Sequence, residues 1–409
     1  MAKTTTNQTP TTNIYKYTTN MSYILDDEVI NMEVYNIKTI AIDSNYDDMN
    51  MPMVFVTLGL YKSIINKMIL NQDRGIIILN IKRCVSNSDM PDIYTDYIND
   101  KFVYFITGDI DETIGVEITE DDPNDTEYMG TVTLGLLSLD HVNKNKKTIS
   151  SGVLNGKLSS VMYYIAGHLP ILIEPPKNNI ILSNVFLPPI NSVSKSLKYL
   201  NSINVFYNTR YRFFIDFDKA YLISSSGKPI KCKGEDISTV MFRLRHEDYN
   251  PEAKIQGMII DQERSMYIMD VDSKDCELSD NHISEKSYSK ISATNASGNK
   301  VEATLSNISP ESSIKMKTRS IRIMNDNNGI LDNIVSHLDT SAIQLLVQKV
   351  DIDTSVLTIN KEYIVRADET YNTELYNGRY ILVRKRELYV REDDNFTMNI
   401  MLLLRKIPE

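Results

Sequence analysis

The chain lacks tryptophan, has little cysteine and contains no long apolar run. Its three cysteines, Cys84, Cys232 and Cys276, lie far apart without a CxxC pair. This spacing argues against both a disulfide framework and a zinc site, and we expect folding in a reducing cytoplasm. No stretch of 18 apolar residues is present, which excludes a transmembrane helix. The polar, threonine-rich residues 1–20 have no apolar core typical of a secretory signal, and we interpret them as a flexible arm.

Positive charge is also in short supply. The chain has 44 Lys and Arg against 54 Asp and Glu, a formal net charge of −10 and a pI of about 5.2. Nucleic-acid binding requires clustered basic residues that replace phosphate counterions, and none is evident. The basic triplets at 210–212 and 384–386 are too short, and we interpret them as strand surface or salt-bridge residues. The same acidity is compatible with a channel through which DNA slides without binding.

Known catalytic motifs are missing as well. We find no GxSxG, Walker A or GxGxxG pattern. The five histidines show no HExxH spacing. Asp216 and Asp218 form a DxD that could hold a metal or act as an acid/base pair, but we interpret them as the polar face of a strand. The acidic run 109–128 does not fit a calcium loop. We therefore predict no enzyme, no catalytic residue, no cofactor and no metal.

What the chain does have is the composition of a folded, mainly β protein. Its 409 residues are 42% hydrophobic and 24% charged, which favours two or three globular domains. Apolar residues at helical spacing predict helices near 60–68, 158–167 and 193–200, the second ending at Gly167 and the third capped by Ser192. Strand patterns dominate elsewhere and are densest in the last 50 residues. They are listed here: 53–58, 75–81, 102–107, 130–137, 318–324, 362–365, 376–383, 387–391 and 396–406.

The most unusual segment is an aromatic hairpin. Five aromatic side chains fall within eleven positions: Tyr211, Phe213, Phe214, Phe217 and Tyr221. This density predicts a strand buried on both faces. One interpretation is ordinary core. The alternative is that some of the aromatics pack a barrel while the others meet a neighbouring subunit.

This segment, SLKYLNSINVFYNTRYRFFIDFDKAYLISSSGKPI at 196–230, resembles the baseplate hub proteins of contractile phage tails, a family that shares its architecture with type VI secretion spike proteins. Three other stretches agree with it: VTLGLLSLDHVNKNKKTISSGVLNGKLSSVMYYI at 132–165, ILIEPPKNNIILSNVFLPPI at 171–190 and the ending YILVRKRELYVREDDNFTMNIMLLLRKIP.

The resemblance implies an α+β, mainly β fold with two β-barrel tube domains. Residues 1–20 would be the arm, 21–145 the first barrel, 146–205 a helical and proline-rich connection, and 206–409 the second barrel with an insertion at about 270–316. Three chains would form a pseudo-sixfold ring in the virion baseplate, assembled in the host cytoplasm. Its implied partners are the tail tube protein, the central spike and the wedge proteins, with DNA as passing cargo and no membrane.

Two alternatives remain open at this point. The chain could be another tail component, such as a tube initiator or a wedge protein. It could instead be a tail-associated glycan hydrolase that uses Asp216 or the acidic run 109–128.

Overall fold

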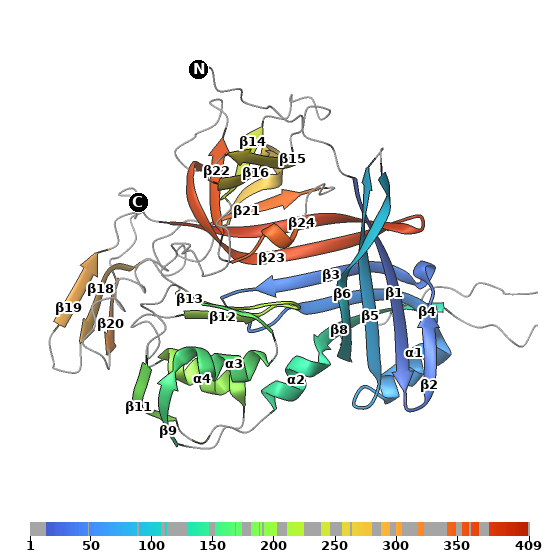
Figure 1. The fold of residues 1–409 in the computed structure, drawn as a ribbon, viewed down its shortest axis with the longest axis horizontal. Helices are drawn as coiled ribbons and strands as arrows, with labels where there is room; N and C mark the ends of the chain where they lie inside the picture. Colours follow the sequence, from blue (N-terminus) through green and yellow to red (C-terminus); the bar gives the residue numbers. More distant parts are fainter. Residues whose placement is uncertain are drawn as a thin grey trace, which may run out of the picture.

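The structure is a computed structural model (Figure 1). It describes residues 14–47, 49–87, 90–107, 111–112, 129–146, 152–167, 169–173, 181–187, 189, 192–202, 211–224, 239–245, 256–261, 264–279, 288–294, 300–304, 317–322, 342–348, 354–359, 361–367 and 376–407.

Eight of the described strands close into an antiparallel barrel. The barrel order is β1 (Ile14–Leu25), β5 (Ile76–Asn87), β6 (Met90–Ile106), β8 (Met129–Ser138), β4 (Met53–Tyr61), β3 (Ile37–Asn45), β23 (Gly378–Glu392), β24 (Asn395–Lys406) and back to β1. Alternate side chains face the interior, as Val54, Val56 and Leu58 on β4 illustrate. Closure leaves the barrel strands with few open edges, which stabilises the sheet against wrong pairing.

Small elements decorate this barrel. Strand β2 (Glu28–Met32) pairs with β1, and β7 (Asp111–Glu112) pairs with β8. A 3-10 turn, η1 (Val34–Asn36), leads into β3. Helix α1 (Lys62–Leu70) turns its apolar face inward and buries Ile65 and Met68 in the core.

A second curved sheet uses the outer ends of β23 and β24. Its other strands are β22 (Glu362–Ala367), β14 (Thr239–Arg245), β16 (Arg264–Asp272), β15 (Gln256–Asp261), β21 (Ala342–Val347) and β17 (Cys276–Ser279). Pairing runs β14, β22, β23, β24, β21, β17. The 3-10 turn η4 (Ser273–Asp275) then links β17 to β16, which pairs with β14. The sheet therefore curls back toward its own start.

Strand β23 changes its inward face where the two sheets meet. Its pairing with β24 skips Val383, which forms a β-bulge. Before the bulge the buried side chains are the even-numbered Tyr380 and Leu382, together with Ile381; after it they are odd-numbered, from Lys385 onward. The extra residue moves every following side chain to the opposite face of the strand, because strand side chains alternate with a period of two.

The connection between the barrel halves combines three helices with five short strands among the described residues. It contains α2 (Leu139–Asn145), β9 (Gly152–Lys157), α3 (Leu158–Ala166), β10 (Ile171–Ile173), β11 (Ile181–Leu187), α4 (Val193–Ser202), β12 (Tyr211–Ile215) and β13 (Ala220–Ser224). Strands β9 and β11 pair with each other. The β12–β13 hairpin joins β10 in a small sheet, which Figure 1 shows between α3 and α4 on one side and the barrel on the other.

The remaining described elements are a three-stranded sheet of β18 (Tyr288–Thr294), β19 (Lys300–Thr304) and β20 (Lys317–Arg322), and the turn η5 (Thr354–Val356). Strands β18 and β19 of this three-stranded sheet fall in residues 270–316, for which a polar insertion was predicted. Most of the acidic run 109–128, Cys232 and His246 lie outside the described residues.

The mainly β fold class is confirmed, and so are the helices α1, α3 and α4. Gly167 ends α3 with φ of 67°, a conformation that glycine adopts without strain. Two details were wrong. The strands expected at 376–383 and 387–391 are one bulged strand, β23. Asp216 and Asp218 lie in the turn after β12 and not on a strand, because Asp216 already donates its backbone N–H to the Lys219 carbonyl.

The division into two tube domains stays a prediction. The pairing adds one constraint, since β23 and β24 close the barrel that the first 140 residues begin. Any boundary at residues 145 and 206 therefore separates segments of a single sheet.

Arg212 ties the hairpin to the bulge. Its guanidinium is buried, donates to the Leu382 carbonyl at 2.9 Å and lies 3.8 Å from the Asp47 carboxylate. Arg405 also donates to Asp47, at 2.9 Å. On the next residue of the bulge, the Val383 carbonyl accepts from the Tyr46 N–H at 3.0 Å. These donors satisfy carbonyls that the bulge withdraws from regular pairing.

We predict that Arg212→Met lowers the free energy of unfolding by about 1–3 kcal/mol, because it leaves the buried Leu382 carbonyl without this donor. Asp47 keeps its hydrogen bond from Arg405, so its carboxylate does not lose every charged partner. Arg386→Met, an exposed change on the same strand, should stay within about 0.5 kcal/mol. Urea unfolding of both variants measures the difference. Equal losses would show that Arg212 has no special structural role.

Candidate functional site

The aromatic hairpin is covered on both faces. All five residues of β12 are buried. Phe214 and Tyr221 belong to the main barrel core, where Phe214 meets the Tyr46 ring edge-on at 4.6 Å between centroids. Tyr211 and Phe213 belong to a second core with α3 and α4. The hairpin is therefore a common wall between two hydrophobic clusters.

Two contacts anchor the hairpin further. The Tyr211 hydroxyl donates to the Leu197 carbonyl on α4 at 2.7 Å. Phe217, which is only partly buried, meets the Phe102 ring edge-on at 6.4 Å. The contacts shown by these aromatics lie within one chain. That any of them meets a neighbouring subunit stays a prediction.

A buried charge pair lies inside the barrel. The Lys385 ammonium is 3.0 Å from the Glu387 carboxylate, and these residues are 5% and 1% exposed. The Tyr97 hydroxyl donates to both Glu387 oxygens, at 2.8 and 2.9 Å, and Tyr389 donates at 3.1 Å. A buried carboxylate is tolerated only with such a full set of partners.

A second bulge brings Tyr97 into this cluster. In the β5–β6 register Ile81 faces Ile98 and Lys82 faces Asp96, so Tyr97 is the extra residue. Ile98 is buried in the core, and Tyr97 packs against the same core. A bulge lets consecutive side chains point to one side of a strand. The two bulges, at Tyr97 and at Val383, thus bring the polar groups of β6 and β23 together.

The cluster favours the charged form of Lys385 and the neutral form of its tyrosines. Burial alone would lower the pKa of Lys385, yet the adjacent Glu387, Tyr97 and Asp216 raise it overall above its ordinary value. Burial, and then the Glu387 charge, raises the pKa of Tyr97 and of Tyr389. Both tyrosines therefore remain hydrogen-bond donors throughout the physiological pH range.

Asp216 faces the same cluster from the hairpin turn. Burial raises its carboxyl pKa, while Lys385 and the hydrogen bond from the Phe217 N–H, at 3.0 Å, lower it in part. Asp218, its partner in the DxD pattern, is exposed. Its negative charge nevertheless raises the Asp216 pKa further, and among the described residues neither carboxylate belongs to a group of three or more that could hold a metal ion.

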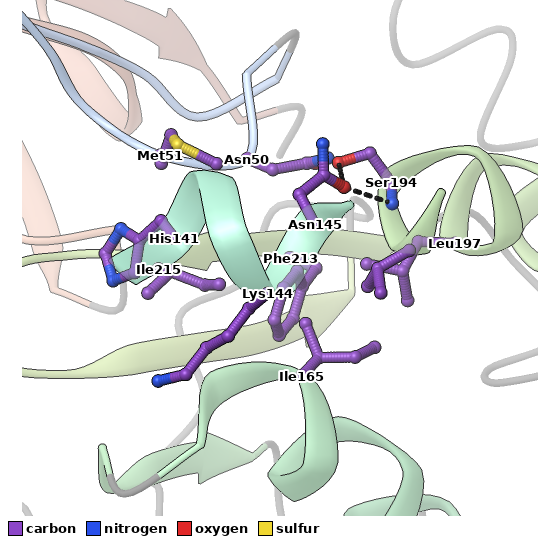
Figure 2. A pocket seen from close by; sticks show the side chains of 11 residues that line it. Asn50, Met51, His141, Lys144, Asn145, Ile165, Ser194, Leu197, Phe213 and Ile215 are labelled. Carbon is purple, nitrogen blue, oxygen red and sulfur yellow. Dashed lines mark hydrogen bonds between the residues drawn. The ribbon is translucent and has the colours of Figure 1, made fainter. Parts of the chain in front are cut away.

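A small pocket lies on the helical side of the hairpin, between α2, α4 and β12 (Figure 2). At its rim, Asn145 accepts from the Ser194 N–H at 2.9 Å and from the Ser194 and Ser192 hydroxyls. Asn145 thus caps α4, the role that the sequence assigned to Ser192. The floor is apolar, with Ile165, Leu197 and Phe213. The lining also includes His141 and Lys144 of α2, and Lys144 pairs with Asp140 on the same helix.

Among the described residues no group of three or more His, Cys, Asp or Glu side chains could hold a metal ion. No described helix has the length and apolar character needed to cross a membrane.

Sequence reasoning missed the Lys385–Glu387–Tyr97 cluster. The run Arg384–Glu387 carries only charged residues and gives no alternation to show which of them face inward. A bulge at Val383 is equally silent in the sequence, because valine is an ordinary strand residue.

We predict that Tyr97→Phe lowers the free energy of unfolding by about 1.5–3 kcal/mol, because Glu387 loses charge-assisted hydrogen bonds in a buried site. Tyr35→Phe removes a hydroxyl from an exposed tyrosine and should change it by less than about 0.5 kcal/mol. Denaturant titration at pH 7 compares them. Similar values for the two variants would contradict a role for the cluster in stability.

We predict that Asp216→Asn becomes more favourable relative to the wild type as pH rises. A raised carboxyl pKa means that the folded state holds the proton more tightly than the unfolded chain. The contribution of Asp216 to stability is therefore complete below its unfolded pKa of about 4 and is lost as pH rises through its folded value. Thermal unfolding from pH 4 to pH 7 measures the trend; a difference that is flat or reversed would contradict it.

Several solved structures are similar to this chain at low sequence identity. No curated protein matches the chain. A tail protein from Neisseria meningitidis MC58 superposes with a TM-score of 0.51 at 10% identity, over 95% of this chain and 97% of that one. The 43 kDa tail protein of prophage MuSo2 from Shewanella oneidensis superposes with a TM-score of 0.44 at 10% identity, over 94% of this chain and 97% of that one. A chain of a Francisella PdpA–VgrG complex superposes with a TM-score of 0.42 at 11% identity, over 96% of this chain and 58% of that one.

The first of these likenesses shows a shared fold. The family evidence is separate and covers nearly the whole sequence, because residues 10–407 match the family described as Bacteriophage PBS1 gene 109 protein. The chain belongs to this bacteriophage protein family.

Proposed function

We propose that the protein is a structural component of a contractile phage tail, the central hub of the baseplate. Three copies form a pseudo-sixfold ring that joins the tail tube to the central spike and lets DNA pass along its axis. In the virion the ring contacts the tube protein, the spike and the wedge proteins. It assembles in the host cytoplasm without a membrane.

The observation that carries this proposal is the β23–β24 hairpin, which belongs to a closed barrel at one end and to a second curled sheet at the other. One chain thereby holds two barrel-like units in a fixed relation. Three such chains supply six units, the number that adapts a sixfold tube to a threefold spike. Closed cyclic symmetry is the usual outcome for such subunits.

The domain division of 1–20, 21–145, 146–205 and 206–409 is part of the proposal, with the C-terminal hairpin shared between the two barrels. The aromatic hairpin would form part of the wall between subunits or the adjoining core. Of its aromatics, the partly buried Phe217 is the best placed to reach a neighbour.

The buried cluster is better suited to fixing the strands of a channel wall than to catalysing a reaction. Fully partnered buried charges hold one arrangement of strands, and the net charge of −10 discourages DNA from adhering to the passage. The family is one of bacteriophage proteins and the structure that shares the fold is a tail protein, and neither description names a catalytic activity.

We expect purified protein, alone or co-expressed with its spike, to give a trimer in native mass spectrometry. In a virion map the chain should occupy three positions on the tail axis beneath the tube. A strict monomer under both conditions, or six copies off the axis as for a wedge protein, would contradict the hub assignment.

A glycan hydrolase is the alternative from another class. Wild-type protein and Asp216→Ala should both leave purified cell walls intact. Wall digestion by the wild type that is lost in Asp216→Ala would favour the hydrolase instead, provided that circular dichroism shows both proteins folded.

A further inference from the structure

Three strands of the barrel continue beyond it as an arm. We define the arm as residues 14–16 of β1, 82–87 of β5 and 90–96 of β6. On one side β24 meets β1 only at Tyr17, opposite Phe396; on the other β8 meets β6 only from Phe102 onward. Figure 1 shows β5 and β6 running past the β23–β24 hairpin. The arm thus leaves the neighbours that flank it within the barrel.

The arm exposes side chains that a folded monomer usually covers. Ile93 and Tyr94 are each 53% exposed, and Thr95 and Asp96 are also exposed. Consecutive strand residues point to opposite faces, so both faces of β6 are open here. Large apolar side chains on such a projecting strand are typical of a surface that another protein covers.

The backbone edge is open too. Among the described strands, none pairs with the outer edge of β6 between Thr95 and Lys101, although β5 pairs with its inner edge. An open edge of this length offers N–H and C=O groups to an added strand.

Charge across the arm is polarised. Lys16 is exposed on β1, Lys82 and Arg83 follow on β5, and the β6 part of the arm carries the exposed Asp96. Two β6 edges placed together would oppose acidic groups and repel. An acidic β6 edge against the basic β1 edge of another copy is instead complementary.

We propose that the arm joins one copy of this chain to the next head to tail, with the β6 edge of one copy against the Lys16 edge of β1 in the neighbouring copy. This inference rests on the proposed ring and names its contact. Strands β1 and β6 are both antiparallel to β5 and therefore parallel to each other. A copy related by rotation about an axis along these strands presents β1 beside β6 in parallel pairing, which closes a ring when the rotation closes.

Paired cysteines test the contact directly. In a Cys84→Ala background, needed because Cys84 lies opposite Lys16 in the register, the variant K16C/D96C should form disulfide-linked multimers that end in a closed covalent trimer. A bond within one chain is excluded, because two strand spacings of about 4.8 Å put these positions about 10 Å apart and disulfides need Cα atoms within about 7 Å.

K16C and D96C alone, and the matched double variant K16C/D218C with an exposed aspartate in the β12–β13 turn, should remain unlinked beyond background. Linking by D96C alone would instead indicate a symmetric β6–β6 contact and overturn the proposal. So would equal linking by the two double variants.

A second measurement uses no cysteine. Ile93→Asp should weaken self-association at least tenfold in sedimentation, whereas Val29→Asp, on an equally exposed apolar position of β2 at 57%, should change it less than twofold. Equal effects of the two changes would overturn the proposal. Trimers in native mass spectrometry without K16C/D96C linking would refute the arm contact and leave the hub assignment standing; a strict monomer with and without the spike would refute both.

Discussion

The structure depends on one long hairpin that belongs both to the barrel and to the second sheet. Strands β23 and β24 line the barrel along one part and the second sheet along the other. A regular β23 would turn Arg384 and Arg386 into the barrel, because strand side chains alternate strictly. The bulge at Val383 prevents this by shifting the alternation, so that the even-numbered Leu382 is buried before it and the odd-numbered Lys385 after it.

That shift takes backbone carbonyls out of regular pairing and buries charged side chains. Neighbouring elements supply the hydrogen bonds that these groups need. The bulge carbonyls take donors from Arg212 on the hairpin and from the Tyr46 backbone. The parity change also buries Lys385 and Glu387, and the barrel accommodates them only because Tyr97 arrives through a bulge of its own. Because such a network is costly when partly satisfied, the two bulges and the hairpin constrain one another.

The same geometry explains how a largely β protein builds a stiff, asymmetric subunit. The aromatic hairpin separates the barrel core from a helical core and fastens both, through Phe214 on one face and Tyr211 on the other. Such coupling between barrel, hairpin and second sheet is the property that the proposed role in a ring requires. Catalysis would instead call for an open site with convergent reactive groups.

The sequence by itself determined the local elements and the density of the core. Apolar spacing placed α1 and α3, Gly167 marked a helix end, and the aromatics of 211–221 required a strand covered on both faces; all of these are short-range signals. The tertiary structure alone decided that Asp43 on β3 would receive Arg384 from β23, that Tyr97 would reach Glu387, and that Asn145 would cap α4. Each of these joins residues far apart in the chain through a bulge or a turn. A bulge moves side chains by changing backbone register, and register is set by the partner strand, which no local pattern of residues specifies.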